Sequence, residues 1–279
     1  MTDGISRKRT ILGIIGSQRK LGNCELFVKE AARHAPDCEL SLVRLPELNV
    51  MPCRGCYRCL DEGICPIEDD IPFLKGQMVS ADAIVIASPV YFLGAHGSVK
   101  MLLDRVFSFF PLVEKMWEKP CILVATYGLK DRIGTAPQTL LTLAAFLGLK
   151  VKAVLTLKAA LPGDVLSDKR HLRTAERVGK GLFEPGRRAG RVRACPFCGN
   201  DIVRVRKTDF ICTVCHGSFL IDERGATRGA PGWDVGDIGF VRDHREWLKG
   251  MKARFMAKRK EIVRLTLPYK DMGRWVKPG

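Results

Sequence analysis

Cysteine is the residue type best placed to do chemistry in this chain: it occurs eleven times in 279 residues, and eight of the eleven fall into two groups. The first group is Cys53, Cys56, Cys59 and Cys65, separated by two, two and five residues. Thiolates at two-residue intervals are typical of cubane iron-sulfur clusters, and a proline follows the last of them, as in ferredoxin sequences. Zinc is the alternative ligand, although zinc sites usually place a longer spacer between two pairs. The spacing predicts an iron-sulfur cluster and leaves zinc, or thiols without metal, open.

The second group consists of two Cys-x2-Cys pairs, with thirteen residues between them and a glycine close after each. Its members are Cys195, Cys198, Cys212 and Cys215. Two such pairs supply four thiolates at tetrahedral reach, and the alternating apolar residues between them favour a hairpin. We expect a zinc ribbon that binds Zn²⁺. Rubredoxin-like iron is the rival, but the spacer is short and only the first pair has the Cys-Pro-x-Cys-Gly form.

A third candidate site is the stretch from Gly16 to Cys24, which follows an apolar β-branched run and opens a helical pattern. Free backbone amides and the helix dipole at such a position favour a phosphate group. Ser17 and Asn23 can add side-chain donors. The stretch lacks the three spaced glycines of a dinucleotide fingerprint and the Gly-Lys-Ser/Thr ending of a P-loop.

The elements that must position these residues alternate between strand and helix. Strands are predicted over 10–15, 39–45, 83–87, 121–126 and 151–157, and helices over 24–34, 71–79, 99–110, 135–147 and 168–182. This order predicts a parallel sheet with helices on both faces. Ligands of such sheets bind beyond the carboxyl ends of the strands, so the loops after the first, third and fourth strands form the expected site. Asp69 and Asp70 are interpreted as helix caps.

The loop after the third strand, Ser88-Pro89-Val90-Tyr91-Phe92, is followed by Lys100, Leu103, Asp104 and Arg105, and this combination resembles the NAD(P)H-dependent FMN reductase family. The resemblance implies a flavodoxin-like fold and FMN as cofactor. It places the FMN phosphate on the first loop, the isoalloxazine ring along the second, and a third loop near the ring. The implied binding residues are Ser17, Arg19, Gly22, Asn23, Cys24, Pro89, Val90, Tyr91, Phe92, Thr126, Tyr127 and Gly128. Cys24 departs from the family pattern, in which many members carry Thr or Ser.

Within that family the first cysteine loop resembles the iron-sulfur flavoproteins, which bind a [4Fe-4S] cluster beside FMN; the likeness covers roughly residues 8 to 183. It implies an FMN-dependent oxidoreductase or electron-transfer protein that couples a two-electron flavin to a one-electron cluster, with NAD(P)H or ferredoxin as candidate donor. No acid-base catalytic residue is expected, and His96 is the one histidine near a flavin loop. A cluster-free FMN or quinone reductase is the main alternative. A redox-sensing protein that binds nucleic acid is less favoured.

Composition and charge divide the chain unevenly. From Gly186 onward, 21 Lys and Arg face 10 Asp and Glu, which leaves most of the net charge of +16 in the last third. We expect a flavodoxin-like domain over 1–185 that contains the cysteine loop 53–65, a zinc ribbon over 190–224, and a loop with a basic helical tail over 225–279. An apolar stripe of Trp247, Met251 and Phe255 is expected to pack on a neighbouring surface.

The cellular compartment and the partners of the protein can also be predicted. It has neither a membrane-length apolar run nor a signal-peptide pattern, which favours the cytoplasm, where cysteines stay reduced. The resemblance implies a homodimer or homotetramer, and the basic tail suits an acidic electron carrier such as ferredoxin.

Overall fold

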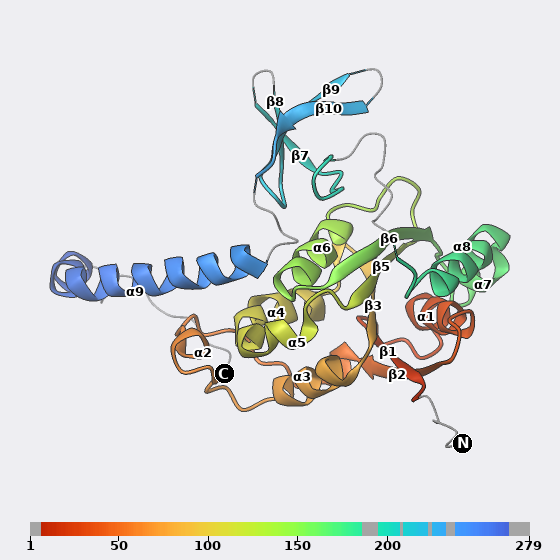
Figure 1. Cartoon of the computed structure of the whole chain (residues 1–279), viewed down its shortest axis with the longest axis horizontal. Helices are drawn as coiled ribbons and strands as arrows, with labels where there is room; N and C mark the ends of the chain where they lie inside the picture. The colour runs from red at the N-terminus through yellow and green to blue at the C-terminus, as the bar shows by residue number, and fades with distance from the viewer. Residues whose placement is uncertain (1–6, 186–194, 207–208, 223–224, 233–237, 268–279) are drawn as a thin grey trace, which may run out of the picture.

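The strands of the first part of the chain form one parallel sheet. The computed structural model describes residues 7–185, 195–206, 209–222, 225–232 and 238–267. Five parallel strands lie in the order β2-β1-β3-β5-β6, and the short β4 pairs antiparallel with β3 (Figure 1). Their bounds are β1 Arg9–Ile15, β2 Cys38–Arg44, β3 Ala83–Tyr91, β4 Gly94–Ala95, β5 Pro120–Tyr127 and β6 Lys150–Lys158. The five predicted parallel strands are confirmed, in the flavodoxin-like order that places a ligand between the loops after β1 and β3.

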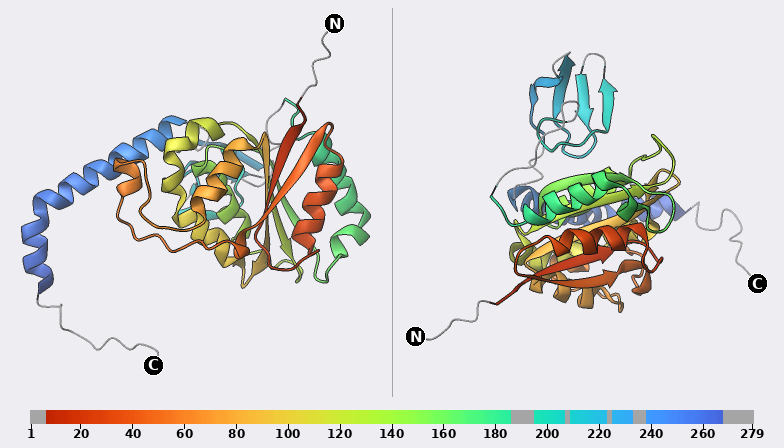
Figure 2. Two further views of the ribbon diagram at one scale, coloured as in Figure 1. Left: turned by 90° about the horizontal axis from the view of Figure 1, so that it is seen from below. Right: turned by 90° about the vertical axis from the view of Figure 1, so that its right-hand side faces the viewer.

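Helices cover both faces of this sheet (Figure 2). The longer ones are α1 Asn23–Arg33, α3 Ile71–Ser80, α4 Gly97–Asp104, α6 Ala136–Phe146 and α8 Lys169–Lys180; the short ones are η1 Leu45–Glu47, α2 Arg58–Asp61, η2 Val106–Leu112, α5 Val113–Met116 and α7 Asp164–Ser167. The prediction of one helix over 99–110 was wrong, because α4 ends before Arg105 and the chain continues as the 3-10 turn η2.

Two apolar layers, one on each side of the sheet, hold the elements together. One layer contains Phe109 and the inner residues of α3, α4 and α6, and the other contains Phe27 and the inner residues of α1 and α8. Strands buried on both faces read as nearly continuous apolar runs, which explains why they could be predicted. At one edge of the first layer, the Lys119 ammonium donates to the carbonyls of Met78, Val79 and Ala81, at the end of α3.

A second, antiparallel sheet follows in the order β10-β9-β8-β7. Its strands are β7 Val203–Arg206, β8 Asp209–Cys212, β9 Ser218–Asp222 and β10 Gly225–Ala230. The predicted hairpin between the cysteine pairs is confirmed by the pairing of β7 with β8. The prediction of a loop at the start of 225–279 was wrong for 225–230, because the backbone there pairs with β9 despite its glycines. Residues 186–189, between the expected domains 1–185 and 190–224, lie outside the described ranges.

The last described element is α9, Ile238–Thr266, which lies along the side of the first domain near α2 and α5 and extends beyond it (Figure 1). Leu248 is its buried contact and packs with Leu60, Phe110 and Val113. The prediction that Trp247, Met251 and Phe255 pack on a neighbouring surface was therefore wrong. Trp247 is 58% exposed and stacks on His244, while Met251 and Phe255 are also exposed. No helix within the described ranges is long and apolar enough to cross a membrane.

Candidate flavin and metal sites

The loop between β1 and α1 forms a cradle at a helix N-terminus. Gly22 caps α1 in an extended conformation, and within the described chain the backbone amides of residues 23–25 have no backbone acceptor. Ser17 is buried, and its Oγ accepts the amide of Arg19 at 3.3 Å. Arg19 is an exposed residue of the same loop. Free amides with a nearby cation can hold a phosphate dianion.

Two predicted phosphate residues use their side chains for structure. The Asn23 amide group donates to the carbonyls of Ala159 and Leu161, and its oxygen accepts the Val165 amide, so the side chain ties α1 to the segment after β6. Cys24 is 2% exposed, with its Sγ 3.3 Å from the Thr126 Oγ1. Burial raises the pKa of the Cys24 thiol to about 11, which keeps it protonated. Asn23 and Cys24 can therefore offer a phosphate only their backbone amides.

An ion-pair network that the sequence analysis missed braces the same loop. Arg44, the last residue of β2, donates Nη1 to the carbonyls of Ser17 and Arg19 at 2.9 and 3.0 Å, and Nη2 to Glu25 at 2.7 Å. The Glu25 carboxylate also accepts Lys29 and the Leu21 amide. Burial alone would raise the pKa of Glu25, but the bonds from Lys29 and Arg44 lower it to about 2. Arg44 thus holds the carbonyls of Ser17 and Arg19 toward its own guanidinium, so that they do not face an anion bound at the start of α1.

The second flavin loop is shorter than predicted, because Ser88 and Pro89 continue β3 and pair with β5. β3 then turns into β4 through Phe92 and Leu93, both at positive φ, as a type I′ hairpin requires. Phe92 is fully exposed, and Tyr91 is half exposed. The turn is held by the Thr135 amide, which donates to the Leu93 carbonyl at 2.7 Å. An exposed aromatic residue held in a strained conformation on a braced turn, as Phe92 is, is suited to contact a flat ring, and Tyr91 lies beside it.

His96 and the third loop lie beside this turn. The His96 amide donates to the Ser88 Oγ at 3.0 Å, its Nδ1 caps α4 by accepting the Ser98 amide, and its ring meets Tyr91 edge-on. Burial lowers the pKa of His96. The third predicted loop is also shorter than expected, because Thr126 and Tyr127 end β5 and pair with β6. Thr126 is buried, the Tyr127 carbonyl accepts the Ala159 amide, and Gly128 follows the strand. The carboxyl ends of β1, β3 and β5 bring the three predicted loops to one edge of the sheet.

The first cysteine loop leaves the carboxyl end of β2 and surrounds the short helix α2. Cys53 and Cys56 are exposed, and Cys59 and Cys65 are half-buried. Burial raises the pKa of Cys59, and so do the nearby charges of the other three thiols. Gly55 and Gly63 adopt positive φ, which glycine adopts without strain. Cys59 therefore lies close enough to the other three thiols for their charges to interact, on a loop that turns sharply at both glycines.

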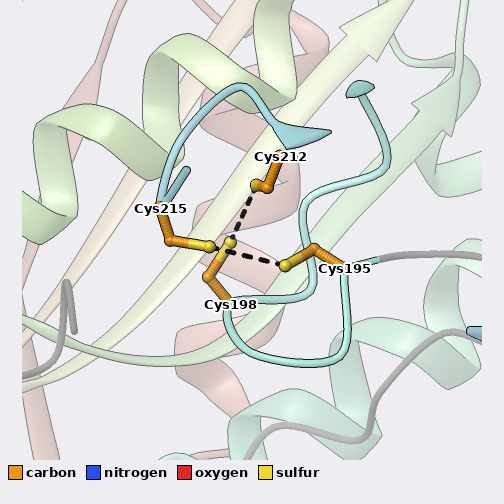
Figure 3. Close-up of side chains that lie close together, drawn as sticks. All are labelled: Cys195, Cys198, Cys212 and Cys215. Carbon is orange, nitrogen blue, oxygen red and sulfur yellow. Dashed lines mark hydrogen bonds between the residues drawn. The ribbon is translucent and has the colours of Figure 1, made fainter. Parts of the chain in front are cut away.

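The second cysteine group is far tighter, with sulfurs from two turns of the small sheet pointing toward one centre (Figure 3). The Sγ atoms of Cys195 and Cys215 lie 3.5 Å apart, as do those of Cys198 and Cys212. All four sulfurs lie within 4.8 Å of one another, and no other group of potential metal ligands in the described chain gathers so closely. Zinc-sulfur bonds of ~2.3 Å in a tetrahedron place sulfurs about 3.8 Å apart, so this group fits one metal ion.

Asp69 and Asp70 differ from the predicted helix caps. Asp70 precedes α3, but its carboxylate accepts the Asn49 amide and makes no capping bond. Asp69 does accept the Ile71 amide at 3.1 Å, yet its buried carboxylate is paired chiefly with Arg105. Bonds of this kind join residues far apart in sequence, which spacing cannot reveal.

Comparisons with known proteins agree with this arrangement of loops. An iron-sulfur flavoprotein of Methanocaldococcus jannaschii is 41% identical over 97 residues, which is 34% of this chain and 50% of the relative. An iron-sulfur flavoprotein of Archaeoglobus fulgidus is 33% identical over 100 residues, 35% of this chain and 46% of the relative. The match thus spans about half the length of these curated relatives.

Two further comparisons cover more of the chain. A putative NAD(P)H-dependent FMN-containing oxidoreductase of Bacillus subtilis is 24% identical over 173 residues, 59% of this chain and 93% of the relative. A solved flavone reductase has the same fold over 97% of this chain and 100% of its own, with a TM-score of 0.70 at 18% identity. Residues 9–162 match the NADPH-dependent FMN reductase family, which implies FMN as cofactor. Because this match covers more than half of the sequence, the chain belongs to the NADPH-dependent FMN reductase family.

Proposed function

We propose that this protein is an iron-sulfur flavoprotein: an FMN-dependent oxidoreductase or electron-transfer protein that carries a [4Fe-4S] cluster on the loop 53–65. The observation that carries the proposal is a four-cysteine loop in a chain of this family whose similar relatives include iron-sulfur flavoproteins. When bound, FMN would exchange two electrons with a donor such as NAD(P)H, and the cluster would exchange one with a carrier such as ferredoxin.

The residues of the flavin edge fit FMN. The amides at the start of α1, with the Arg19 side chain and the Ser17 hydroxyl, would hold the phosphate. Pro89, Val90, Tyr91 and Phe92 would line the ring, and Thr126, Tyr127 and Gly128 would approach it from β5. His96 caps a helix and its pKa is lowered by burial, so it stays neutral and holds the second loop in place. The exposed Phe92 would exclude water from one side of the ring.

The two cysteine groups fit different metals. Sulfurs 3.5 Å apart support one Zn²⁺ at Cys195, Cys198, Cys212 and Cys215, where it would stabilise the small sheet. The thiols of Cys53, Cys56, Cys59 and Cys65 do not gather in this way around one centre, and on these thiols we propose a cluster, which is wider than one ion. Cys53 and Cys56 on the exposed side would let a cluster exchange electrons with a docked carrier. None of the eleven cysteines forms a disulfide bond, in keeping with a proposed reducing, cytoplasmic setting.

Anaerobic purification and reconstitution test the proposal directly. We would measure FMN, iron, sulfide and zinc per chain, with paramagnetic resonance after dithionite, on the wild type and a Cys56→Ala variant. The matched control is Cys38→Ala, since Cys38 lies outside both groups. The expected result is one FMN, about four irons and one zinc per chain, with only the iron lost in Cys56→Ala. FMN without iron after faithful reconstitution would refute it and leave a cluster-free FMN or quinone reductase.

A homodimer or homotetramer is part of the proposal. The flavin loops and the neighbouring segment after β6 carry exposed apolar side chains: Leu21, Tyr91, Phe92, Leu93 and Leu129 on the loops, and Leu161 after β6. Apolar side chains gathered near a ligand site suit contact with a second copy of the chain. Light scattering at several concentrations would test this, and a monomer throughout would count against it.

A further inference from the structure

Arg105 is a cation fully buried beside the cysteine loop. It follows the last residue of α4, and its side chain is 1% exposed, while that of its partner Asp69 is 0% exposed. Nη1 pairs with the Asp69 carboxylate and donates to the Met51 carbonyl. Nη2 donates to the Sγ of Cys65 at 3.3 Å. One guanidinium thus contacts a carboxylate, a backbone carbonyl and a proposed cluster ligand.

These contacts join the two ends of the cysteine loop. Met51 precedes the first cysteine, whereas Cys65 and Asp69 follow the other three, and the Asp69 carboxylate also accepts the Met51 amide at 3.0 Å. A buried ion pair is costly unless its remaining donors and acceptors are satisfied, and here they are bonded to the loop. The planar fork of arginine can reach three acceptors at once, which a lysine ammonium cannot do in the same geometry.

A guanidinium that donates to a ligand sulfur also has an electronic effect. Hydrogen bonds to ligand sulfurs and nearby positive charge favour the more negative, reduced state of an iron-sulfur cluster and so raise its potential. α4 begins at the flavin turn, where the His96 amide is bonded to Ser88, and ends at Arg105. The arginine is therefore carried by the same rigid helix that supports the flavin loop.

From these contacts we propose that Arg105 is a positioning residue for the cluster: it fixes Cys65 as a ligand, closes the loop over the metal, and sets the reduction potential. The inference rests on the proposed function, since it concerns the cluster of loop 53–65. It predicts that two properties change together when the arginine is altered, namely retention of the cluster and its midpoint potential.

The test uses the full-length, reconstituted protein. Arg105→Lys keeps the charge that pairs with Asp69 but removes the fork, and the double variant Arg105→Met with Asp69→Asn removes both buried charges and leaves neither unpaired. Arg33→Met is the matched control, because Arg33 is exposed on α1, outside the cysteine loop, and bonds to Glu30. Iron and sulfide per FMN, the rate of iron loss to a chelator, and the midpoint potential of the cluster are measured.

Both Arg105 variants are expected to lose iron about tenfold faster than the wild type and to show a more negative midpoint potential, with FMN content unchanged. Arg33→Met is expected to match the wild type. A purely structural role would not move the potential of the cluster that remains, so an unchanged potential in both variants would overturn the inference alone, even if iron is lost faster. A wild type that holds no iron would overturn the proposed function, and this inference with it.

Discussion

Arg44 offers a test of how the phosphate loop is organised. Its guanidinium is mostly buried and makes three hydrogen bonds, to the carbonyls of Ser17 and Arg19 and to the Glu25 carboxylate, and its Nε also pairs with the exposed Glu47. Arg44→Met removes all three but leaves Glu25 paired with Lys29, so no buried charge becomes unpaired. We expect the loop to lose the orientation that turns its carbonyls away from the phosphate.

The size of the effect follows from those bonds. Hydrogen bonds to charged groups contribute ~1.5–3 kcal/mol each, but three bonds from one guanidinium overlap in effect, so the free energy of unfolding should fall by about 2–3 kcal/mol. Only part of this free energy affects FMN binding, namely the cost of reordering the loop when FMN binds. We set it at about 1.4 kcal/mol, which is a tenfold increase in the dissociation constant.

Fluorescence titration of the apoprotein with FMN and with riboflavin measures this effect. Riboflavin lacks the phosphate, so Arg44→Met should weaken FMN binding and leave riboflavin binding unchanged. Arg33→Met is the control, because Arg33 is exposed on α1 and pairs only with Glu30. Equal FMN affinity in Arg44→Met, Arg33→Met and the wild type would refute the bracing argument, as would an equal loss for both ligands.

Three further predictions concern pH, the second metal and α9. The pKa of Glu25 is lowered from 4.5 to about 2, so its ion pairs stabilise the fold fully above pH 4.5. As the pH falls toward 2, the free energy of unfolding should fall by roughly 1–2 kcal/mol. Denaturant unfolding at several pH values should show a smaller loss for Glu25→Gln. Cys212→Ser should remove about one zinc per chain by metal analysis without lowering FMN content, and retained zinc would argue against the ligand set. Leu248→Ala should destabilise the docking of α9 by about 2 kcal/mol and speed proteolysis within 238–267, whereas Trp247→Ala, at an exposed position, should not.

The centre of the parallel sheet could be predicted because β1, β3 and β5 are buried on both faces and read as apolar runs. Strand ends could not, since Ser88 and Pro89 join β3 only through pairing with β5. β10 was missed for a similar reason: glycines indicate a turn by local propensity, while the strand is created by backbone pairing with β9. Local patterns thus identify strand cores, and pairing decides how far each strand extends.

At the candidate site, residue types could be predicted but their partners could not. Cysteine spacing identified both cysteine groups as candidate metal sites, yet the geometry of four sulfurs around one centre in the second group depends on the turns of the small sheet. Asn23 shows the opposite case: the position suggests a phosphate ligand, while the structure commits its side chain to the segment after β6. A polar residue near a helix start can serve either purpose, and only its tertiary contacts decide.

The cysteine loop is held from two sides by residues that no sequence spacing connects. Arg105 bonds to Cys65 from α4, and from α9 the Arg245 side chain donates to the Leu60 carbonyl while Lys252 pairs with Asp61. The loop itself contains little apolar side chain to bury, so its conformation depends on these external contacts. Cluster retention should therefore respond to changes in α4 and α9, which lie outside the cysteine motif, as well as to changes in the motif.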